Sequence, residues 1–402
     1  MSHVVVIGAG QAGSSLVVKL RNQGFDGQIT LIGEEKAPPY QRPPLSKKYL
    51  LGEMDLERLY LKPESFYAEN EINLRTGETV SALDVYKGTI TVSGEELKYD
   101  HLVFTTGSKL RYLPASIGGD LDGVYGVRGL TDVDAMEPEF AEGKHVLVIG
   151  GGYIGLEAAA VASAKGLKVT LVEMADRILQ RVACSQTSYY FRALHRSKGV
   201  NIIEGVGLDH LIGDDGRVVG AKLSDGTEMD IDFAIVGVGI LPNIDVAEDA
   251  GVEIDNGIAT DAYGCTSFSN IWAAGDCASF PYKGERIRLE SVPNAIDQAE
   301  IVAENIMGAK KPYVAKPWFW SDQYDVKLQI AGLNTGYDDV VTRQGDKDST
   351  VSFWYYKGDQ LLAVDAMNDP RGYMIGKRVI EAGKTIDKAA VADPDADLKS
   401  FM

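Results

Sequence analysis

Two glycine-rich segments with the same layout dominate this sequence of 402 residues. In each, an apolar run of strand length enters G-x-G-x-x-G and a helical segment follows, which is the context that a βαβ dinucleotide-binding unit requires. The first copy spans Val4 to Gly13 and the second spans His145 to Gly155. A single copy could be a glycine-rich turn between a buried strand and a helix. Two copies predict an α/β protein with two Rossmann-like domains, which suggests two bound dinucleotides, a flavin and a nicotinamide.

The first motif predicts a strand at 4–7, a helix at 14–22 and a second strand at 28–32. Gly8 would make the tight turn, Gly10 would let the backbone approach a pyrophosphate, and Gly13 would let the helix pack on the strand. The acid that could bind the adenosine ribose, Glu34, comes one position late because Gly33 directly follows the apolar run.

The second motif predicts a helix at 156–164 and a strand at 167–172 that ends directly at Glu173. A carboxylate there can bind ribose hydroxyls and would repel the 2′-phosphate of NADPH, which favours NADH. Arg177 could suggest a phosphate ligand, but we expect it to pair with Glu173 or Asp176 or to stack on adenine. The motif residues expected at the nucleotide are Gly150, Gly152, Tyr153, Ile154 and Gly155.

Composition excludes several other classes of protein. A net charge of −18 with a pI near 4.8 argues against general nucleic-acid binding. The longest apolar runs have the length of a strand, so no membrane span is expected. The chain enters a strand within three residues, which leaves no room for a secretory signal and predicts a cytoplasmic protein. The three cysteines and five histidines lack disulfide-framework or zinc spacing, so no metal is expected.

Six further segments resemble known flavoproteins. Two segments, YDHLVFTTGS (99–108) and FAIVGVGILPN (233–243), resemble the strand-turn segments that close each nucleotide domain in two-dinucleotide-binding-domain flavoproteins. A third segment, SNIWAAGDCA (269–278), resembles the second FAD motif of these proteins. Within that class, the chain more specifically resembles the ferredoxin reductases of bacterial haem-thiolate monooxygenase and ring-hydroxylating dioxygenase systems. That likeness rests on PPYQRPPLSKKYL (38–50), ESVPNAIDQA (290–299) and PWFWSDQYD (317–325).

The resemblance implies two Rossmann-like dinucleotide-binding domains of the glutathione reductase type and a small α+β C-terminal domain. Residues 1–112 and 242–319 would form a discontinuous FAD-binding domain. Residues 113–241 would form the NADH-binding domain, and residues 320–402 would form the C-terminal domain.

The resemblance also implies a set of FAD contacts. Asp276 would hydrogen-bond the ribityl chain, and Val292 would place a helix N-terminus at the flavin N1–C2=O edge. Lys47 and Arg128 would neutralise pyrophosphate or flavin charge, or else be a solvated lysine and a surface ion pair. Trp318 and Trp320 could be core aromatics, but the resemblance favours Trp320 at the flavin. The full FAD set is Gly8, Gly10, Ala12, Gly13, Glu34, Arg42, Pro43, Lys47, Val80, Thr106, Gly107, Arg128, Asp276, Val292 and Trp320.

Two catalytic residues follow from the same resemblance. Glu157 would lie near the nicotinamide and pair with Lys47. The alternative for Glu157 is a helix N-terminal acid that complements the dipole. The turn residues Gly237 and Gly239 complete the set expected at NADH.

The expected activity is NADH:ferredoxin oxidoreduction, with hydride passing from NADH to FAD and single electrons passing to a 2Fe-2S ferredoxin in a transient complex. The chain has no cluster-binding cysteine pattern, so the acceptor cluster must be on another protein. Residues 41–50 contain no cysteine, which excludes a disulfide reductase with a C-x4-C pair there. The alternatives left open are an NADH-dependent reductase of a quinone or dehydroascorbate, and a redox-sensing flavoprotein. Lys283, Arg286 and Arg288 are a candidate docking patch, or simply solvated loop charges.

Overall fold

The structure is a computed structural model that describes residues 2–347 and 349–401. It contains two compact units. The first comprises Met1–Arg42, Asp55–Lys109 and Ile240–Pro317, and the second comprises Pro43–Met54, Leu110–Gly239 and Trp318–Met402. The segment around Lys47 therefore belongs to the second unit, although the sequence placed it within the first domain. Strands β8 (Ser108–Leu110) and β17 (Ile240–Pro242) lie where the chain passes between the units.

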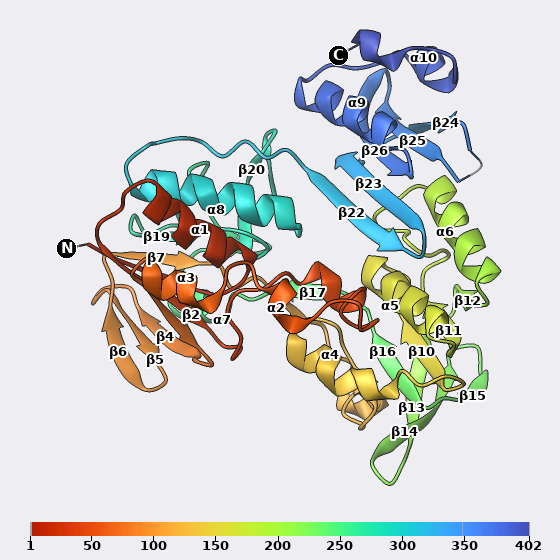
Figure 1. Ribbon diagram of the computed structural model, residues 1–402, viewed down its shortest axis with the longest axis horizontal. Coiled ribbons are helices and arrows are strands. Elements are labelled where there is room, and N and C mark those ends of the chain that lie inside the picture. Colours follow the sequence, from red (N-terminus) through yellow and green to blue (C-terminus); the bar gives the residue numbers. More distant parts are fainter. Residues whose placement is uncertain (1, 348, 402) are drawn as a thin grey trace. The chain divides into compact units, whose positions relative to one another are not determined.

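A five-stranded parallel sheet forms the centre of the first unit. In sheet order its strands are β19 (Ile271–Ala273), β7 (His101–Phe104), β1 (His3–Ile7), β2 (Gln28–Gly33) and β3 (Ile72–Thr76). Helices α1 (Gln11–Asn22) and α8 (Val292–Ile306) lie side by side on one face (Figure 1). Since both faces of a parallel sheet are covered, its strands are almost continuously apolar.

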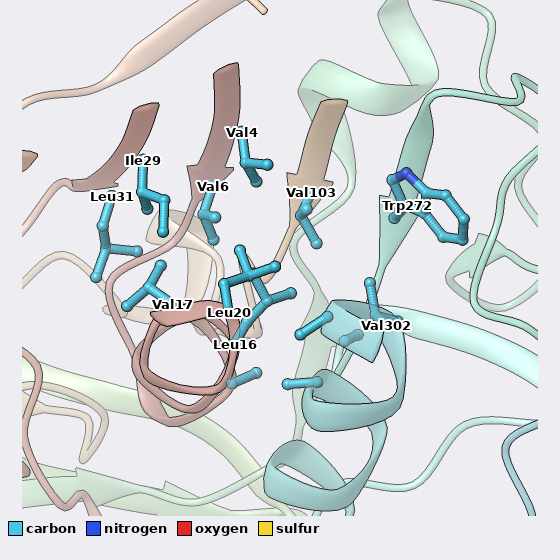
Figure 2. Packing of buried hydrophobic residues seen from close by; sticks show 14 of the residues in the cluster. Val4, Val6, Leu16, Val17, Leu20, Ile29, Leu31, Val103, Trp272 and Val302 are labelled. Atoms are coloured by element: carbon cyan, nitrogen blue, oxygen red, sulfur yellow. The ribbon is translucent and has the colours of Figure 1, made fainter. Parts of the chain in front are cut away.

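The core beneath α1 is built from the alternation along the strands. Val4 and Val6 of β1 point to the same face and meet Leu16 and Leu20 of the helix (Figure 2). Val5, between them, belongs to the core on the opposite face. All five side chains are fully buried. This packing fixes the loop between β1 and α1, which carries the first glycine motif.

Smaller elements complete the first unit. They are the antiparallel sheet β4 (Val80–Asp84), β5 (Thr89–Val92) and β6 (Glu95–Lys98), the sheet β18 (Ile258–Ala259), β20 (Ala278–Tyr282) and β21 (Glu285–Ile287), and helices α2 (Leu56–Leu59), α3 (Glu64–Glu69) and α7 (Asp245–Asp249).

The second unit repeats the architecture around the second glycine motif. Its five-stranded parallel sheet consists, in order, of β12 (Asn201–Glu204), β11 (Lys168–Glu173), β10 (His145–Ile149), β16 (Phe233–Val236) and β9 (Val124–Tyr125). One face packs against the sheet β13 (Leu208–Asp214), β14 (Arg217–Leu223) and β15 (Glu228–Asp230). The helices of this region are α4 (Leu130–Met136), α5 (Tyr153–Ala164) and α6 (Ser185–Ser197).

The C-terminal segment of the second unit is an antiparallel sheet with helices. Its strands, in sheet order, are β22 (Trp318–Gln323), β23 (Val326–Gly332), β26 (Gln360–Met367), β25 (Val351–Lys357) and β24 (Asp339–Gln344), followed in sequence by α9 (Pro370–Glu381) and α10 (Lys388–Ala392). Strand β22 contacts α5, and so does the 3₁₀ turn η1 (Pro43–Ser46). Helix α5 has mostly apolar residues around its circumference, as expected for a helix that other elements cover from several directions. Three more 3₁₀ turns are η2 (Ala115–Ile117), η3 (Glu137–Glu139) and η4 (Leu398–Phe401).

The sequence placed the start of both motif helices three residues too late. Helix α1 begins at Gln11 and α5 begins at Tyr153, so the third glycine of each motif lies within the first helical turn. Across residues 2–347 and 349–401, no helix combines the length and hydropathy needed to span a bilayer.

Candidate active site

The three glycines of the first motif have different steric surroundings. Gly8 has φ +113°, and a Cβ on it would lie 2.2 Å from the Thr105 carbonyl oxygen. A Cβ on Gly13 would lie 2.2 Å from the Gly8 carbonyl oxygen, so the helix can approach only where a side chain is absent. A Cβ on Gly10, the residue before α1, would meet no atom within 4 Å. The open space is therefore at the helix N-terminus, where a pyrophosphate would be bound.

The predicted ribityl-binding aspartate lies between the starts of two helices. Gly275, with φ +83°, packs against Ala12 of α1 and Ala295 of α8, and Asp276 follows it. The Ser108 hydroxyl lies 3.5 Å from Asp276 Oδ2. Arg288, which the sequence did not assign to the site, donates to the Asp276 carbonyl at 3.2 Å and to the Asn256 carbonyl. Val292 is the first residue of α8, as predicted, and the Ser291 hydroxyl caps that helix through the Asn294 amide.

The end of β2 carries the predicted ribose acid. Because β2 extends through Gly33, Glu34 directly follows the strand, and the expected one-residue delay is absent. Its side chain is exposed. The next acid, Glu35, forms an ion pair with Arg42 and accepts a hydrogen bond from Tyr40 at 2.5 Å. Val80 begins β4 close to this strand end, where the Glu78 amide donates to the Gly33 carbonyl.

The turn after β7 contains Thr106 and Gly107. The Thr106 hydroxyl donates to the Asn243 carbonyl at 2.5 Å, and the Asn243 amide donates to the Gly107 carbonyl at 2.9 Å. The neighbouring Thr105 hydroxyl donates to the Gly8 carbonyl at 2.8 Å. These bonds tie the turn to the first glycine motif.

The second glycine motif repeats the steric pattern of the first. Gly150 has φ +106°, and a Cβ on it would lie 2.5 Å from the Gly237 carbonyl oxygen. A Cβ on Gly155 would lie 2.2 Å from the Gly150 carbonyl oxygen. A Cβ on Gly152 would meet no atom within 4 Å, as is also true of Gly10. Ile154 in the first turn of α5 is exposed, whereas Tyr153 is half-buried with its hydroxyl group inside the protein. Gly239 has φ +113° in the turn after β16.

Glu173 ends β11 and holds the second motif in place. Its Oε2 accepts from the Gly151 amide at 2.7 Å, and its Oε1 accepts from the Ala175 amide at 2.8 Å. Carboxylate oxygens have two acceptor sites each, so both retain capacity for ribose hydroxyls. Arg177 does not pair with Glu173 or Asp176 as expected.

The Arg177 guanidinium instead donates to the carbonyls of Gln180, Ala183 and Cys184 and to the Ser188 hydroxyl. Its hydrogen-bonding groups are used to shape the loop before α6. The predicted ion pair with Glu173 or Asp176 was wrong, because the guanidinium is used by acceptors within this loop, which the sequence alone does not reveal.

Lys47 and Glu157 form the pair that the resemblance implied. Lys47 Nζ lies 2.6 Å from Glu157 Oε2, with the two side chains 15% and 5% exposed. Glu157 is the fifth residue of α5, not part of its first turn, because the helix starts earlier than predicted. Because Glu157 is buried and paired with Lys47, it is not an acid that only complements the helix dipole. The Ser46 hydroxyl also donates to Oε2, at 2.8 Å.

The remaining FAD candidates of the second unit have different surroundings. Pro43 begins η1, and its carbonyl accepts from Lys47 Nζ at 3.2 Å. Arg128 is half-buried just before α4, and its amide donates to Asp132. Trp318 packs onto the C-terminal core and Tyr373. Trp320 is half-buried, its ring is tilted against that of Trp318 with the centroids 5.6 Å apart, and it is not among the residues packed against the C-terminal core.

The expected basic patch is largely neutralised. Arg286 donates to the carbonyls of Thr260 and Ser279 and lies 3.6 Å from an Asp255 carboxylate oxygen. Arg288 is only 12% exposed and forms an ion pair with Glu290. Lys283 is exposed at the tip of the β20–β21 hairpin. The arginines therefore fasten this hairpin, which argues against a docking patch made of all three.

The cysteines offer no redox pair within the described residues. Cys184, Cys265 and Cys277 are free thiols, and Cys184 and Cys277 are buried. Burial raises the pKa of the Cys265 thiol to about 11 and also raises the pKa of Cys277. Electrons from a bound flavin would therefore not leave through a disulfide of this chain.

Comparison with known proteins identifies the family. The pyridine nucleotide-disulphide oxidoreductase model matches residues 2–299, and the reductase C-terminal model matches residues 318–402. A ferredoxin–NAD(P)(+) reductase of Sphingomonas sp. is 41% identical, over 99% of this chain and 97% of that protein.

Two solved structures are similar along the whole chain. One is the putidaredoxin reductase of a covalent putidaredoxin reductase–putidaredoxin complex, with a TM-score of 0.96 and 36% identity, covering 100% of this chain and 98% of the other. The second is the ferredoxin reductase for the CYP199A2 system from Rhodopseudomonas palustris, with a TM-score of 0.96 and 39% identity, covering 100% and 99%. The α/β class with two Rossmann-like domains and a C-terminal domain is thereby confirmed. The chain belongs to the pyridine nucleotide-disulphide oxidoreductase family and is an oxidoreductase that uses FAD and a nicotinamide nucleotide.

Proposed function

We propose that this protein is an NADH:ferredoxin oxidoreductase that delivers single electrons to a 2Fe-2S ferredoxin, which in turn serves a haem-thiolate monooxygenase or a ring-hydroxylating dioxygenase. The observation that carries the proposal is the full-length similarity to ferredoxin reductases, which includes the C-terminal segment. The lack of a cysteine at 41–50 supports it, because a redox disulfide beside the flavin would divert the electrons.

In this proposal the first glycine motif binds the FAD pyrophosphate at the N-terminus of α1, Glu34 binds the ribose and Asp276 binds the ribityl chain. FAD, when bound, accepts hydride from NADH and releases electrons one at a time. The work of the protein is to hold nicotinamide and flavin in contact, for which no catalytic base is required. Lys47 and Glu157 contribute orientation and charge close to the nicotinamide.

The proposal extends to location and domains. Because NADH is generated in the cytoplasm, we place the enzyme there. We retain the three-domain division, with FAD bound by 1–112 and 242–319, NADH by 113–241, and a C-terminal domain at 320–402, except that Pro43–Met54 packs with the second unit. The boundary between the two family models, at 299 and 318, supports the start of the last domain.

The test is NADH-dependent reduction of cytochrome c by the purified yellow protein, with and without a 2Fe-2S ferredoxin. The rate should be low alone and should rise to saturation as ferredoxin is added, because cytochrome c accepts electrons readily from the small iron-sulfur protein. Rapid NADH-driven reduction of a quinone or dehydroascorbate together with no response to any 2Fe-2S ferredoxin would instead favour the small-molecule reductase.

The nucleotide preference should depend on the charge of Glu173. The wild-type protein should favour NADH in kcat/KM by at least about tenfold, or about 1.4 kcal/mol, because a carboxylate facing a 2′-phosphate is repulsive. Glu173→Gln removes the charge and keeps an oxygen acceptor for one of the Gly151 and Ala175 amides, although its NH2 group cannot accept from the other. The preference should narrow in this variant as NADPH activity rises.

Asp176→Asn is the matched control, because Asp176 is exposed and lies three residues away. It should leave the NADH preference unchanged. A wild-type preference for NADPH, or a full NADH preference in the Gln variant, would remove Glu173 as the selecting residue.

A further inference from the structure

The Glu157 carboxylate receives hydrogen bonds from widely separated parts of the second unit. Oε2 accepts from Lys47 and Ser46 of the segment that contains η1. Oε1 accepts from the Ser321 hydroxyl at 2.6 Å, which comes from β22, 164 residues later in the chain. Ser321 is fully buried. Among the described residues, its hydroxyl is the one group that donates a hydrogen bond to Glu157 Oε1.

Ser321 is itself oriented by a buried chain of polar groups. Gln323 Nε2 donates to Ser321 Oγ at 3.2 Å, and Gln323 Oε1 lies 2.8 Å from His195 Nε2. The side chains of Gln323 and His195 are fully buried. The Tyr324 hydroxyl lies 3.4 Å from His195 Nδ1.

The direction of this chain follows from the chemistry of its members. A carboxylate only accepts hydrogen bonds, so the Ser321 proton points to Glu157 and the Ser321 oxygen is left to accept from the Gln323 amide. The Gln323 oxygen then accepts from His195, which fixes the proton of a neutral ring on Nε2. Burial lowers the pKa of His195 to about 4, which keeps the ring neutral near pH 7.

We propose that Ser321, oriented by Gln323 and His195, is a positioning residue that holds Glu157 against Lys47. Strand β22 of the C-terminal segment thus contributes to hydride transfer in addition to any role in binding a partner. This inference rests on the proposed function. Without the Ser321 hydroxyl, Glu157 Oε1 is a buried oxygen without a donor, and the carboxylate gains by rotating away from Lys47 to find one.

The first test is the rate constant for reduction of the bound flavin by NADH, measured in a single turnover without ferredoxin. Ser321→Ala should lower this constant by about tenfold or more, since small displacements of positioning groups have large effects on rate. The FAD content and the NADH concentration for half-maximal rate should change little. Ser321→Thr, which keeps the hydroxyl, should restore most of the rate.

Ser352→Ala is the matched control. Ser352 is also fully buried in the C-terminal antiparallel sheet, but its hydroxyl accepts from Trp354 Nε1 and does not contact Glu157. It should lower thermal stability and leave flavin reduction unchanged. An equal loss of rate in Ser352→Ala and Ser321→Ala would overturn the proposal, because a general loosening of the sheet would then explain both.

A second readout does not depend on turnover. The shifts in holoenzyme thermal midpoint caused by Ser321→Ala, Glu157→Ala and the double change should be strongly non-additive, because each single change removes one partner of the same hydrogen bond. Additive midpoints would overturn the positioning role. If NADH fails to reduce the wild-type flavin, the proposed function fails, whereas the coupling between Ser321 and Glu157 still decides whether Ser321 positions the carboxylate.

Discussion

Gly8→Ala should yield a protein that folds poorly and retains little FAD. An alanine there would combine an unfavourable φ of +113° with a Cβ 2.2 Å from the Thr105 carbonyl oxygen. The backbone conformation alone costs about 1–3 kcal/mol, and the clash with rigid backbone adds to it. We expect a total loss of several kcal/mol, seen as a lower thermal midpoint and a lower ratio of flavin absorbance to protein.

Two other alanine variants separate the causes. Gly24→Ala also has positive φ, at +81°, but meets no atom within 4 Å, so it should show the cost of the backbone alone. Gly10→Ala has extended backbone and open space, so the fold should survive while FAD is lost, because the methyl group enters the space proposed for the pyrophosphate. If Gly10→Ala retains full FAD affinity, the pyrophosphate is not bound at this turn.

Asp365→Asn should remove a pH dependence of stability of about 3 kcal/mol. Asp365 is completely buried in β26, where its Oδ2 accepts from Tyr355 and, at 2.7 Å, from Thr187. Its Oδ1 makes no hydrogen bond to any described residue. Burial raises the pKa of this carboxyl from 3.8 to about 6.

The direction of the effect follows from linkage. The folded-state pKa is above the unfolded value, so the folded protein binds the proton more tightly. The stabilisation is complete below about pH 4 and is lost as the pH rises through 6. A shift of roughly two units corresponds to about 3 kcal/mol. The groups facing Asp365 add no compensating cation, because burial raises the pKa values of Tyr355 and Tyr153 and both hydroxyls stay neutral.

The measurement is the thermal midpoint of the holoenzyme from pH 4 to pH 8, the range over which most of this stabilisation is lost. Relative to Asp365→Asn, the wild-type midpoint should fall by a few degrees over this range. Asp120→Asn, at an exposed aspartate of the same unit, should follow the wild type. Parallel pH profiles for the wild type and Asp365→Asn would mean that Asp365 does not take up a proton in the folded state.

The sequence determined the two glycine motifs, the flanking strands and the order of the nucleotide-binding regions. These features are local, because the strand, turn and helix of a βαβ unit are consecutive and each glycine is required by a nearby backbone contact. The start of α8 at Val292 was expected from the family resemblance, and the helix does begin there. The errors at α1 and α5 concern only where the helix begins after the turn.

The tertiary structure alone decided which side chains meet. Lys47 and Glu157, 110 residues apart, were paired in advance only through a family resemblance, and nothing in the sequence indicated the contacts that Ser321 makes with Glu157 or Arg288 makes with the Asp276 carbonyl. Arg286 and Arg288 read as a surface patch because a sequence does not reveal that backbone carbonyls will surround a guanidinium. Asp365 gave no sign of burial either, since one acidic residue in an apolar strand is consistent with an exposed edge. Such contacts are formed when distant segments fold together, so their energies depend on burial and partners that exist only in the folded protein.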